Sequence, residues 1–285
     1  MTEHEKNKIL PSTLYLVATP IGNLEDITLR ALKILTECDF IAAEDTRVTA
    51  KLLATYELRK PLVTYEEHTK RAAGERILER LKAGESCALV TDAGTPGISD
   101  PGEDLVRLCA EHGIRVVPIP GACAAISALI VSGLATRRFV FEGFLDGKDS
   151  EKRERLSDLA AETRTLIFYE APHRLKETLA HMAEAFGGER RITLCREITK
   201  LNEEVLRFTL SEAIAYAENK PPRGEFVLLV EGKQQNEGCF WQNMTVREHV
   251  SYYVDTMGLE KMAAVKATAK DRGVPKNSVY RELID

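Results

Sequence analysis

Short apolar runs alternate with amphipathic segments over most of the chain. Between the runs, apolar residues recur at helical spacing, as at Leu105, Leu108 and Cys109. The runs are rich in β-branched residues and predict strands at 14–19, 40–43, 61–64, 87–91 and 116–119. Alternating strands and helices predict a largely parallel sheet that helices cover on both faces.

A second series of runs follows the first, with an expected helix at 174–186 between them. These runs predict strands at 139–142, 165–169, 192–196, 205–209 and 226–230. The connection from Arg196 to Val205 is short, which favours an antiparallel pair and therefore a mixed sheet.

The last part of the chain has a different pattern. Residues 233–243 are polar and typical of a linker, Thr245 and Glu248 have the spacing of a capping box, and a second helix is expected at 260–271. Pro275 then allows a third helix to begin. We therefore expect the fold class α/β, with an N-terminal α/β domain at 13–121, a second α/β domain at 122–233 and a helical extension at 244–285.

Composition narrows the function classes. The net charge of −5 excludes a global positive field for nucleic acid, so RNA binding would need local patches. The cysteines form no C-x-x-C pair, which argues against zinc and disulfides; they are Cys38, Cys87, Cys109, Cys123, Cys195 and Cys239.

The uncharged run 116–136 is broken by Pro118 and Pro120, which favours a buried helix over a membrane span. Charged residues 1–8 do not resemble a secretory signal, so we expect a soluble, cytoplasmic protein.

Three loops that follow predicted strands carry the candidate chemistry. They are 19–26, 91–102 and 120–124, and the second contains Gly94, Pro96, Gly97, Pro101 and Gly102. Ligands of open α/β sheets bind beyond the carboxyl ends of the strands, where such loops converge. Neither a G-x-G-x-x-G motif nor a phosphate-binding loop is present. Asp92 could meet a ribose or a ligand amine, and the alternative is that it caps a helix or a turn.

At these residues the chain resembles the small-subunit ribosomal RNA 2′-O-methyltransferases of the tetrapyrrole methylase superfamily. The resemblance covers roughly 14–232 and rests on the segments 18–28, 42–47, 90–96, 99–102, 118–121, 141–145, 168–170, 173–174, 196–197, 199–200 and 224–225. The tail at 262–283 resembles a helical region that porphyrin methylases lack, which favours RNA as the acceptor.

The resemblance implies two α/β domains with S-adenosyl-L-methionine in the cleft between them, a homodimer, and methylation of a cytidine ribose 2′-oxygen in 16S ribosomal RNA near the decoding centre. The implied cofactor contacts are Pro20, Gly22, Asp92, Ala93, Gly94, Ile98, Cys123, Ala124, Glu170 and Gly224. Cys123 and Ala124 depart from the family pattern, which often has two hydroxyl residues there.

Methyl transfer from a sulfonium is an in-line displacement that needs no metal, but the acceptor hydroxyl needs a group to take its proton. The residues considered are Glu44, Asp45, Asp100, His173, Glu197 and Lys200. We expect Glu44, Asp45, Arg47 and Asp100 to carry the catalysis, with Arg47 holding a phosphate. Alternatively, Asp45 or Thr46 caps a helix that begins near Arg47.

Basic residues after the 143–145 loop and in the tail are candidates for contact with the RNA backbone. They are Lys148, Lys152, Arg153, Arg155, Lys261, Lys266, Lys270, Arg272 and Lys276, with the pairs at 137–138 and 190–191. Acidic residues interleave with the first cluster, so a solvated helix face is the alternative. Two other functions stay open: a porphyrin or corrin carbon methyltransferase, and a non-catalytic RNA-binding ribosome assembly factor.

Overall fold

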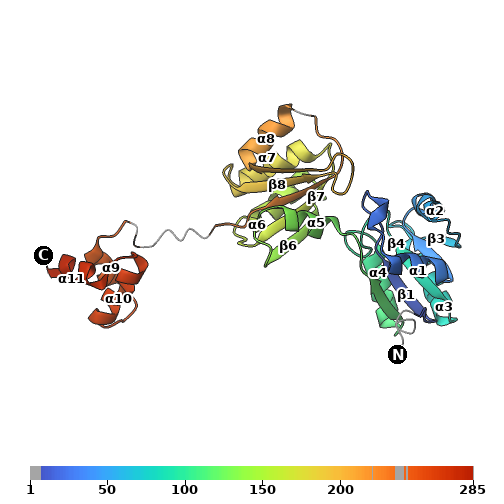
Figure 1. Cartoon of the computed structure of the whole chain (residues 1–285), viewed down its shortest axis with the longest axis horizontal. Coiled ribbons are helices and arrows are strands. Elements are labelled where there is room, and N and C mark those ends of the chain that lie inside the picture. The colour runs from blue at the N-terminus through green and yellow to red at the C-terminus, as the bar shows by residue number, and fades with distance from the viewer. Residues whose placement is uncertain (1–7, 220, 235–240, 242, 285) are drawn as a thin grey trace. The chain divides into compact units, whose positions relative to one another are not determined.

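The computed structural model describes residues 8–219, 221–234, 241 and 243–284, and Figure 1 shows its elements in chain order. The chain folds into two compact units, 1–232 and 233–285. The expectations for the first seven residues and for Cys239 lie outside the described residues. The domain limits at 121 and 122 stay a prediction.

The first sheet is entirely parallel and has the strand order β3-β2-β4-β1-β5. Its strands are β1 (Thr13–Val17), β2 (Phe40–Ala43), β3 (Leu62–Thr64), β4 (Ser86–Val90) and β5 (Arg115–Ile119). The intervening helices are α1 (Leu29–Glu37), α2 (Thr46–Thr55), α3 (Lys70–Lys82) and α4 (Gly102–Glu111), with a 3-10 turn at Leu24–Asp26. This arrangement confirms the expected parallel sheet.

Alternation along the strands supplies a core on each face of this sheet. Tyr15 and Ile41 pack with residues of α1 and α2, whereas their neighbours Leu14 and Phe40 pack with residues of α3 and α4. Successive side chains of a strand point to opposite faces, so a strand buried on both sides is apolar throughout. The continuous apolar runs that predicted these strands therefore supply side chains to both cores.

The second sheet is mixed, with the order β6-β7-β10-β8-β9. β6 and β7 are parallel, and the other pairs are antiparallel, including the expected pair β8 with β9. The strands are β6 (Phe139–Phe144), β7 (Thr165–Glu170), β8 (Arg191–Arg196), β9 (Glu204–Thr209) and β10 (Phe226–Val230). One face packs against α6 (Asp149–Leu159), α7 (Leu175–Phe186) and α8 (Leu210–Asn219), the other against α5 (Ala124–Val131).

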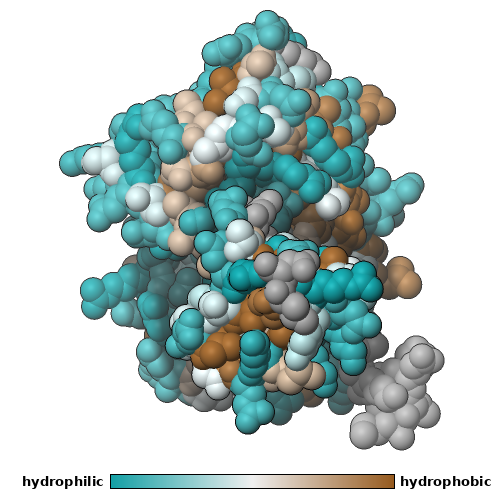
Figure 2. Space-filling model, turned by 90° about the vertical axis from the view of Figure 1, so that its left-hand side faces the viewer, coloured by the Kyte–Doolittle hydropathy of each residue, from teal (hydrophilic) through white to brown (hydrophobic). Residues whose placement is uncertain are grey.

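The uncharged run between the sheets forms α5, which is only half buried. Ala125, Ala128 and Leu129 face the second sheet, whereas Ile126 and Ile130 are 44% and 71% exposed. The expectation of a buried helix was therefore wrong for one face, because one helix can turn only one side to one sheet. No helix within the described residues has the length and apolar character needed to cross a bilayer. Hydrophilic residues prevail on the face drawn in Figure 2.

The C-terminal unit has its own small core. Its helices are α9 (Val246–Asp255), α10 (Lys261–Asp271) and α11 (Lys276–Ile284), and Val250, Val265 and Val279 are buried between them. Thr245 and Glu248 form the expected capping box at the start of α9. The three helices confirm the helical region predicted from the sequence.

Candidate functional site

The loops that follow β1, β4 and β5 are tied together by hydrogen bonds. Thr19 N donates to Gly94 O at 2.8 Å and Gly94 N donates to Thr19 O at 3.1 Å, while Thr95 Oγ1 donates to Ala122 O at 3.0 Å. Gly94 has φ +84°, and a Cβ there would lie 3.2 Å from Ile21 Cγ2. The three loops expected from the sequence thus form one rigid assembly.

These loops line a cavity of about 600 Å³ together with residues of the second sheet. The first half contributes Ile21, Glu44, Thr91, Asp92, Ala93, Gly94, Thr95, Ile98, Ser99 and Asp100, and the second half contributes Cys123, Ala124, Phe144, Tyr169, Glu170, Ala171, Pro172, His173, Cys195, Ile198, Glu225, Phe226 and Val227. Mainly apolar walls with a few polar groups are typical of small-molecule sites of this size. Seven implied cofactor residues therefore share one cavity: Asp92, Ala93, Gly94, Ile98, Cys123, Ala124 and Glu170.

Two acids lie side by side in this cavity. Glu44 Oε2 accepts hydrogen bonds from Thr91 Oγ1 at 2.6 Å and from Asp92 N at 3.3 Å, and Asp92 Oδ1 accepts one from Asp45 N at 3.1 Å. Burial, and then the neighbouring Glu44, raise the pKa of Asp92. Within the described residues, no lysine or arginine forms an ion pair with either acid. A bound cation would relieve this repulsion.

The structure places Asp45 and Arg47 outside the cavity lining. Asp45 caps α2 by accepting a hydrogen bond from Arg47 N at 2.7 Å, and its carboxylate pairs with the guanidinium of Arg47, whose side chain is 85% exposed. The hydrogen bonds from Arg47 lower the pKa of Asp45 to about 2. The geometry thus favours the cap that the sequence left open as the alternative.

Asp100 lines the cavity, but its carboxylate is engaged by the backbone. Its oxygens accept hydrogen bonds from Gly97 N at 2.9 Å, Ile98 N at 3.2 Å and Gly102 N at 2.8 Å. These bonds hold the 97–102 turn, in which Ser99 has φ +61°. Geometry gives Asp100 a role in shaping the loop, so Glu44 is the other cavity-lining acid among the four residues expected to carry the catalysis.

Glu170 is likewise committed to structure. Its buried carboxylate accepts hydrogen bonds from Ala171 N at 2.8 Å and from Thr178 Oγ1, and Arg174 Nε lies 3.3 Å away. These contacts join the end of β7 to the start of α7. Ala171, Pro172 and the exposed His173 follow in the cavity wall, so Glu170 fixes the backbone that carries them.

Pro20, Gly22 and Gly224 do not line the cavity. A Cβ on Gly22 would lie 2.3 Å from Lys200 Cγ, and one on Gly224 would lie 2.5 Å from the side chain of Glu197. Both glycines therefore make room for neighbouring side chains, while the residues beside them in sequence, Ile21 and Glu225, reach the cavity.

Lys200 and Glu197 form a network at the edge of the site. Lys200 Nζ donates to Glu197 Oε1 and to Glu225 Oε2, both at 3.0 Å. Burial opposes the charge on Lys200, but these two bonds outweigh it and raise its pKa. A lysine held in its charged form is unsuited to act as a general base.

Several lining residues were not among the predicted site residues. Tyr169 and Phe144 are the main ones, and burial raises the pKa of Tyr169 to about 12. Phe144 lies in the 141–145 segment, but strand alternation alone does not reveal which way its ring points. A register shift between Phe141 and Gly143 decides that direction.

The basic cluster after the 143–145 loop is paired with acids. Lys152 Nζ lies 3.3 Å from Glu177, Arg153 pairs with Asp149 and Glu184, and Arg155 pairs with Glu142. Arg190 donates to the backbone oxygens of Glu231 and Ala160. The geometry thus favours the solvated helix face over a surface ready for RNA. In the C-terminal unit, Arg272 donates to Met244 O, whereas Lys261, Lys266, Lys270 and Lys276 are exposed.

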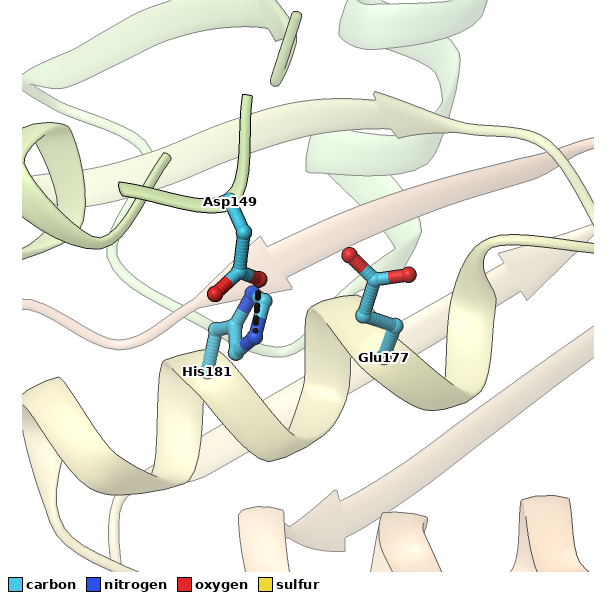
Figure 3. A group of neighbouring side chains, drawn as sticks. All are labelled: Asp149, Glu177 and His181. Carbon is cyan, nitrogen blue, oxygen red and sulfur yellow. Dashed lines mark ion pairs between the residues drawn. The ribbon is translucent and has the colours of Figure 1, made fainter. Parts of the chain in front are cut away.

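A separate group lies between α6 and α7. Asp149 Oδ1 is 2.9 Å from His181 Nε2, and Glu177 stands beside them on the same helix as His181 (Figure 3). The three side chains could together hold a metal ion. Lys152 and Arg153 already pair with the two carboxylates, so the group forms an ion-pair network between α6 and α7.

The cavity fits the expected cofactor, S-adenosyl-L-methionine. Its apolar walls, including Ile21 and Val227, suit an adenosine moiety, and its acids suit the ammonium, sulfonium and ribose hydroxyl groups. The carboxylates of Glu44 and Asp92, which have no ion-pair partner among the described residues, can attract the positive charge of such a ligand. The donor set thus agrees with the group that the sequence led us to expect.

Comparisons with known proteins identify a family match and solved structures with the same fold. The family of Tetrapyrrole (Corrin/Porphyrin) Methylases matches residues 13–214. Among solved structures, a uroporphyrin-III-C-methyltransferase from Thermus thermophilus has a TM-score of 0.56 at 22% identity, over 77% of this chain and 94% of that one. A diphthine synthase has a TM-score of 0.59 at 14% identity, over 78% and 90% of the two chains. These likenesses establish the fold of the two α/β halves.

Relatives with higher identity extend over nearly the whole chain. The ribosomal RNA small subunit methyltransferase I of Bacillus subtilis is 50% identical over 94% of this chain and 92% of its own length. The proteins of that name from Synechocystis and Escherichia coli O157:H7 are 46% and 42% identical, over 94% and 100% of this chain and 96% and 99% of theirs. The chain therefore belongs to the tetrapyrrole methylase family and, within it, to the group of ribosomal RNA small subunit methyltransferase I proteins. This membership confirms the resemblance found in the sequence.

Proposed function

We propose that this protein methylates the ribose 2′-oxygen of a cytidine in 16S ribosomal RNA near the decoding centre, with S-adenosyl-L-methionine as the methyl donor. The observation that carries the proposal is the cavity with the Glu44 and Asp92 pair, in a chain whose relatives bear the name of a ribosomal RNA methyltransferase. Membership of this group favours RNA over a tetrapyrrole as the acceptor.

The loops of the first half provide the cofactor contacts. Asp92, Ala93, Gly94 and Ile98 would hold the cofactor from one side, and Cys123 with Ala124 from the start of α5. When bound, the cofactor supplies an activated methyl group on a sulfonium. Because Thr19 and Gly94 fix these loops, the cofactor would be held in one orientation, as an in-line displacement requires.

Glu44 is our choice for the group that takes the proton of the acceptor hydroxyl. Thr91 and Asp92 N fix one of its oxygens, which leaves the other for a substrate hydroxyl. A positioned carboxylate lowers the barrier by accepting the proton as the new bond to oxygen forms. Asp45 and Arg47 would act from outside the cavity by holding α2 and its N-terminus, and Asp100 by holding its loop.

The decisive experiment is deletion of the gene and mapping of ribose methylation in 16S ribosomal RNA. Loss of one cytidine methylation, restored by the unaltered gene but not by Glu44→Gln, is the expected result. An unchanged map would contradict the ribosomal target. Calorimetric titration with S-adenosyl-L-methionine tests the enzyme itself, since an assembly factor without catalysis would show no binding.

We further propose that the protein acts as a homodimer in the cytoplasm, where its ribosomal substrate is made. The face of α5 that carries Ile126, Ile130 and Val131 is exposed and apolar, and a second copy would cover it. Light scattering should give twice the chain mass, and Ile130→Glu should shift it towards the monomer.

A further inference from the structure

Phe144 occupies an unusual position for an apolar side chain. The residue is 43% exposed, and it lines both the main cavity and a second cavity of about 420 Å³ beside it. Ser99 and Asp100 also line both cavities. Phe144 therefore lies at the boundary between the two cavities.

The backbone is built to direct Phe144 to this place. Between Phe141 and Gly143 the register of β6 against β7 shifts, and Phe144 then pairs with Tyr169. Gly143 has φ +67°, and a Cβ there would lie 2.9 Å from Ser99 Oγ. A bulge of this kind changes the direction of the following side chains and is common beside active sites.

Neighbouring aromatic rings hold Phe144 in position. Its ring centroid lies 5.5 Å from that of Tyr169, which in turn packs edge-on against Phe141 at 5.1 Å. Ala125 N donates to Tyr169 Oη at 3.3 Å, which ties this group to the start of α5. A ring supported in this way offers a fixed apolar surface to a ligand.

Charge indicates what part of an RNA would lie there. Lys70 lines the second cavity and is already paired with Glu67 and Asp104. The acids of that cavity are Glu67, Asp100, Glu103, Asp104, Glu142 and Asp146. Arg107, Arg155 and Arg174 pair with Asp104, Glu142 and Asp146, and Lys70 is itself paired, so this lining offers a phosphate no free cation. It can still accept the neutral face of a base, and its carboxylates can accept a hydrogen bond from the amino group on a base edge.

We infer that Phe144 is the stacking surface for the nucleobase whose ribose receives the methyl group. The inference rests on the proposed function and deepens it, because it names the residue that positions the acceptor. Aromatic side chains bind unpaired bases by stacking, with little regard to sequence. The base would lie on Phe144 while its ribose reaches past Ser99 into the main cavity.

The test compares Phe144→Leu with Phe144→Trp in the full-length protein. Phe139→Leu is the matched control, because Phe139 is an exposed phenylalanine of the same strand that does not line either cavity. Steady-state methylation of small-subunit RNA gives KM and kcat, and calorimetry gives the affinity for S-adenosyl-L-methionine. We expect Phe144→Leu to raise the KM for RNA about 10- to 100-fold, with the cofactor affinity and kcat nearly unchanged.

The tryptophan variant adds a direct readout. It should retain a KM close to that of the unaltered protein, and RNA should quench the emission of the introduced tryptophan beyond the change seen with Trp241, the chain's sole native tryptophan. An unaltered KM in Phe144→Leu, or an equal rise of KM in the leucine and tryptophan variants, would overturn this inference and leave the proposed function standing. Absence of RNA methylation by the unaltered protein would instead contradict the proposed function and the nucleobase with it.

Discussion

Two groups of acids in this molecule show opposite electrostatics. In the cavity, Glu44 and Asp92 lie together without an ion-pair partner among the described residues, and burial raises the pKa of Asp92. Between α6 and α7, the hydrogen bond from Arg153 lowers the pKa of Asp149, and Lys152 compensates Glu177. Acids without a cationic partner, such as Glu44 and Asp92, indicate a ligand-binding site. Acids that are paired with lysine or arginine, such as Asp149 and Glu177, instead indicate a structural role.

The largest effect should come from replacing the acid that faces the cavity. Glu44→Gln keeps the hydrogen bonds to Thr91 and Asp92 but cannot take a proton, so we expect kcat to fall about 10²- to 10⁴-fold. The adjacent Asp45→Asn keeps the cap of α2 and should leave turnover close to normal. Methyl transfer to RNA measures both. Equal turnover in the two variants would contradict the proposal that Glu44 takes the proton while Asp45 only caps α2.

Asp92→Asn should weaken the cofactor site next. Loss of a charge-assisted hydrogen bond typically costs about 1.5–3 kcal/mol, so the Kd for S-adenosyl-L-methionine should rise about 10- to 100-fold. Calorimetry measures this change directly. Asp149→Asn is the control, because Asp149 lies outside the cavity lining and should not alter the Kd. A Kd unchanged by Asp92→Asn would show that the carboxylate does not meet the ligand.

The sequence predicted strands and loops well, because buried parallel strands are apolar throughout and their ends carry the loops. It did not predict how neighbouring polar residues divide their tasks. Glu44 and Asp45 are adjacent in sequence, yet one faces the cavity and the other caps α2, a difference set by the turn between β2 and the helix. Phe144 was missed because its direction depends on a register shift with β7, a contact between segments that periodicity does not contain.

Opposite pKa shifts predict opposite effects of pH. The raised pKa of Asp92 means that the folded protein holds its proton more tightly than the unfolded chain, so its contribution to stability is greatest at low pH and is lost as pH rises through the raised pKa. The lowered pKa of Asp149 gives stability at neutral pH that is lost as pH falls through that lowered value. At pH 7, Asp92→Asn should therefore raise the unfolding midpoint slightly and Asp149→Asn should lower it. Thermal unfolding at pH 7 and pH 4 would detect both, and shifts of the same sign would contradict the contrast.

The smallest expected effect concerns metal at the Asp149, Glu177 and His181 group. Because Lys152 and Arg153 already compensate its carboxylates, a divalent cation would have to displace those side chains and gain little. Dialysis against a chelator, or addition of zinc, should leave the unfolding midpoint and the turnover of the protein unchanged. His181→Gln serves as a reference, since a zinc effect that it abolishes would identify a metal site there. Such an effect would also contradict the contrast between the two groups of acids, because the paired acids would then bind a ligand as the cavity acids are expected to do.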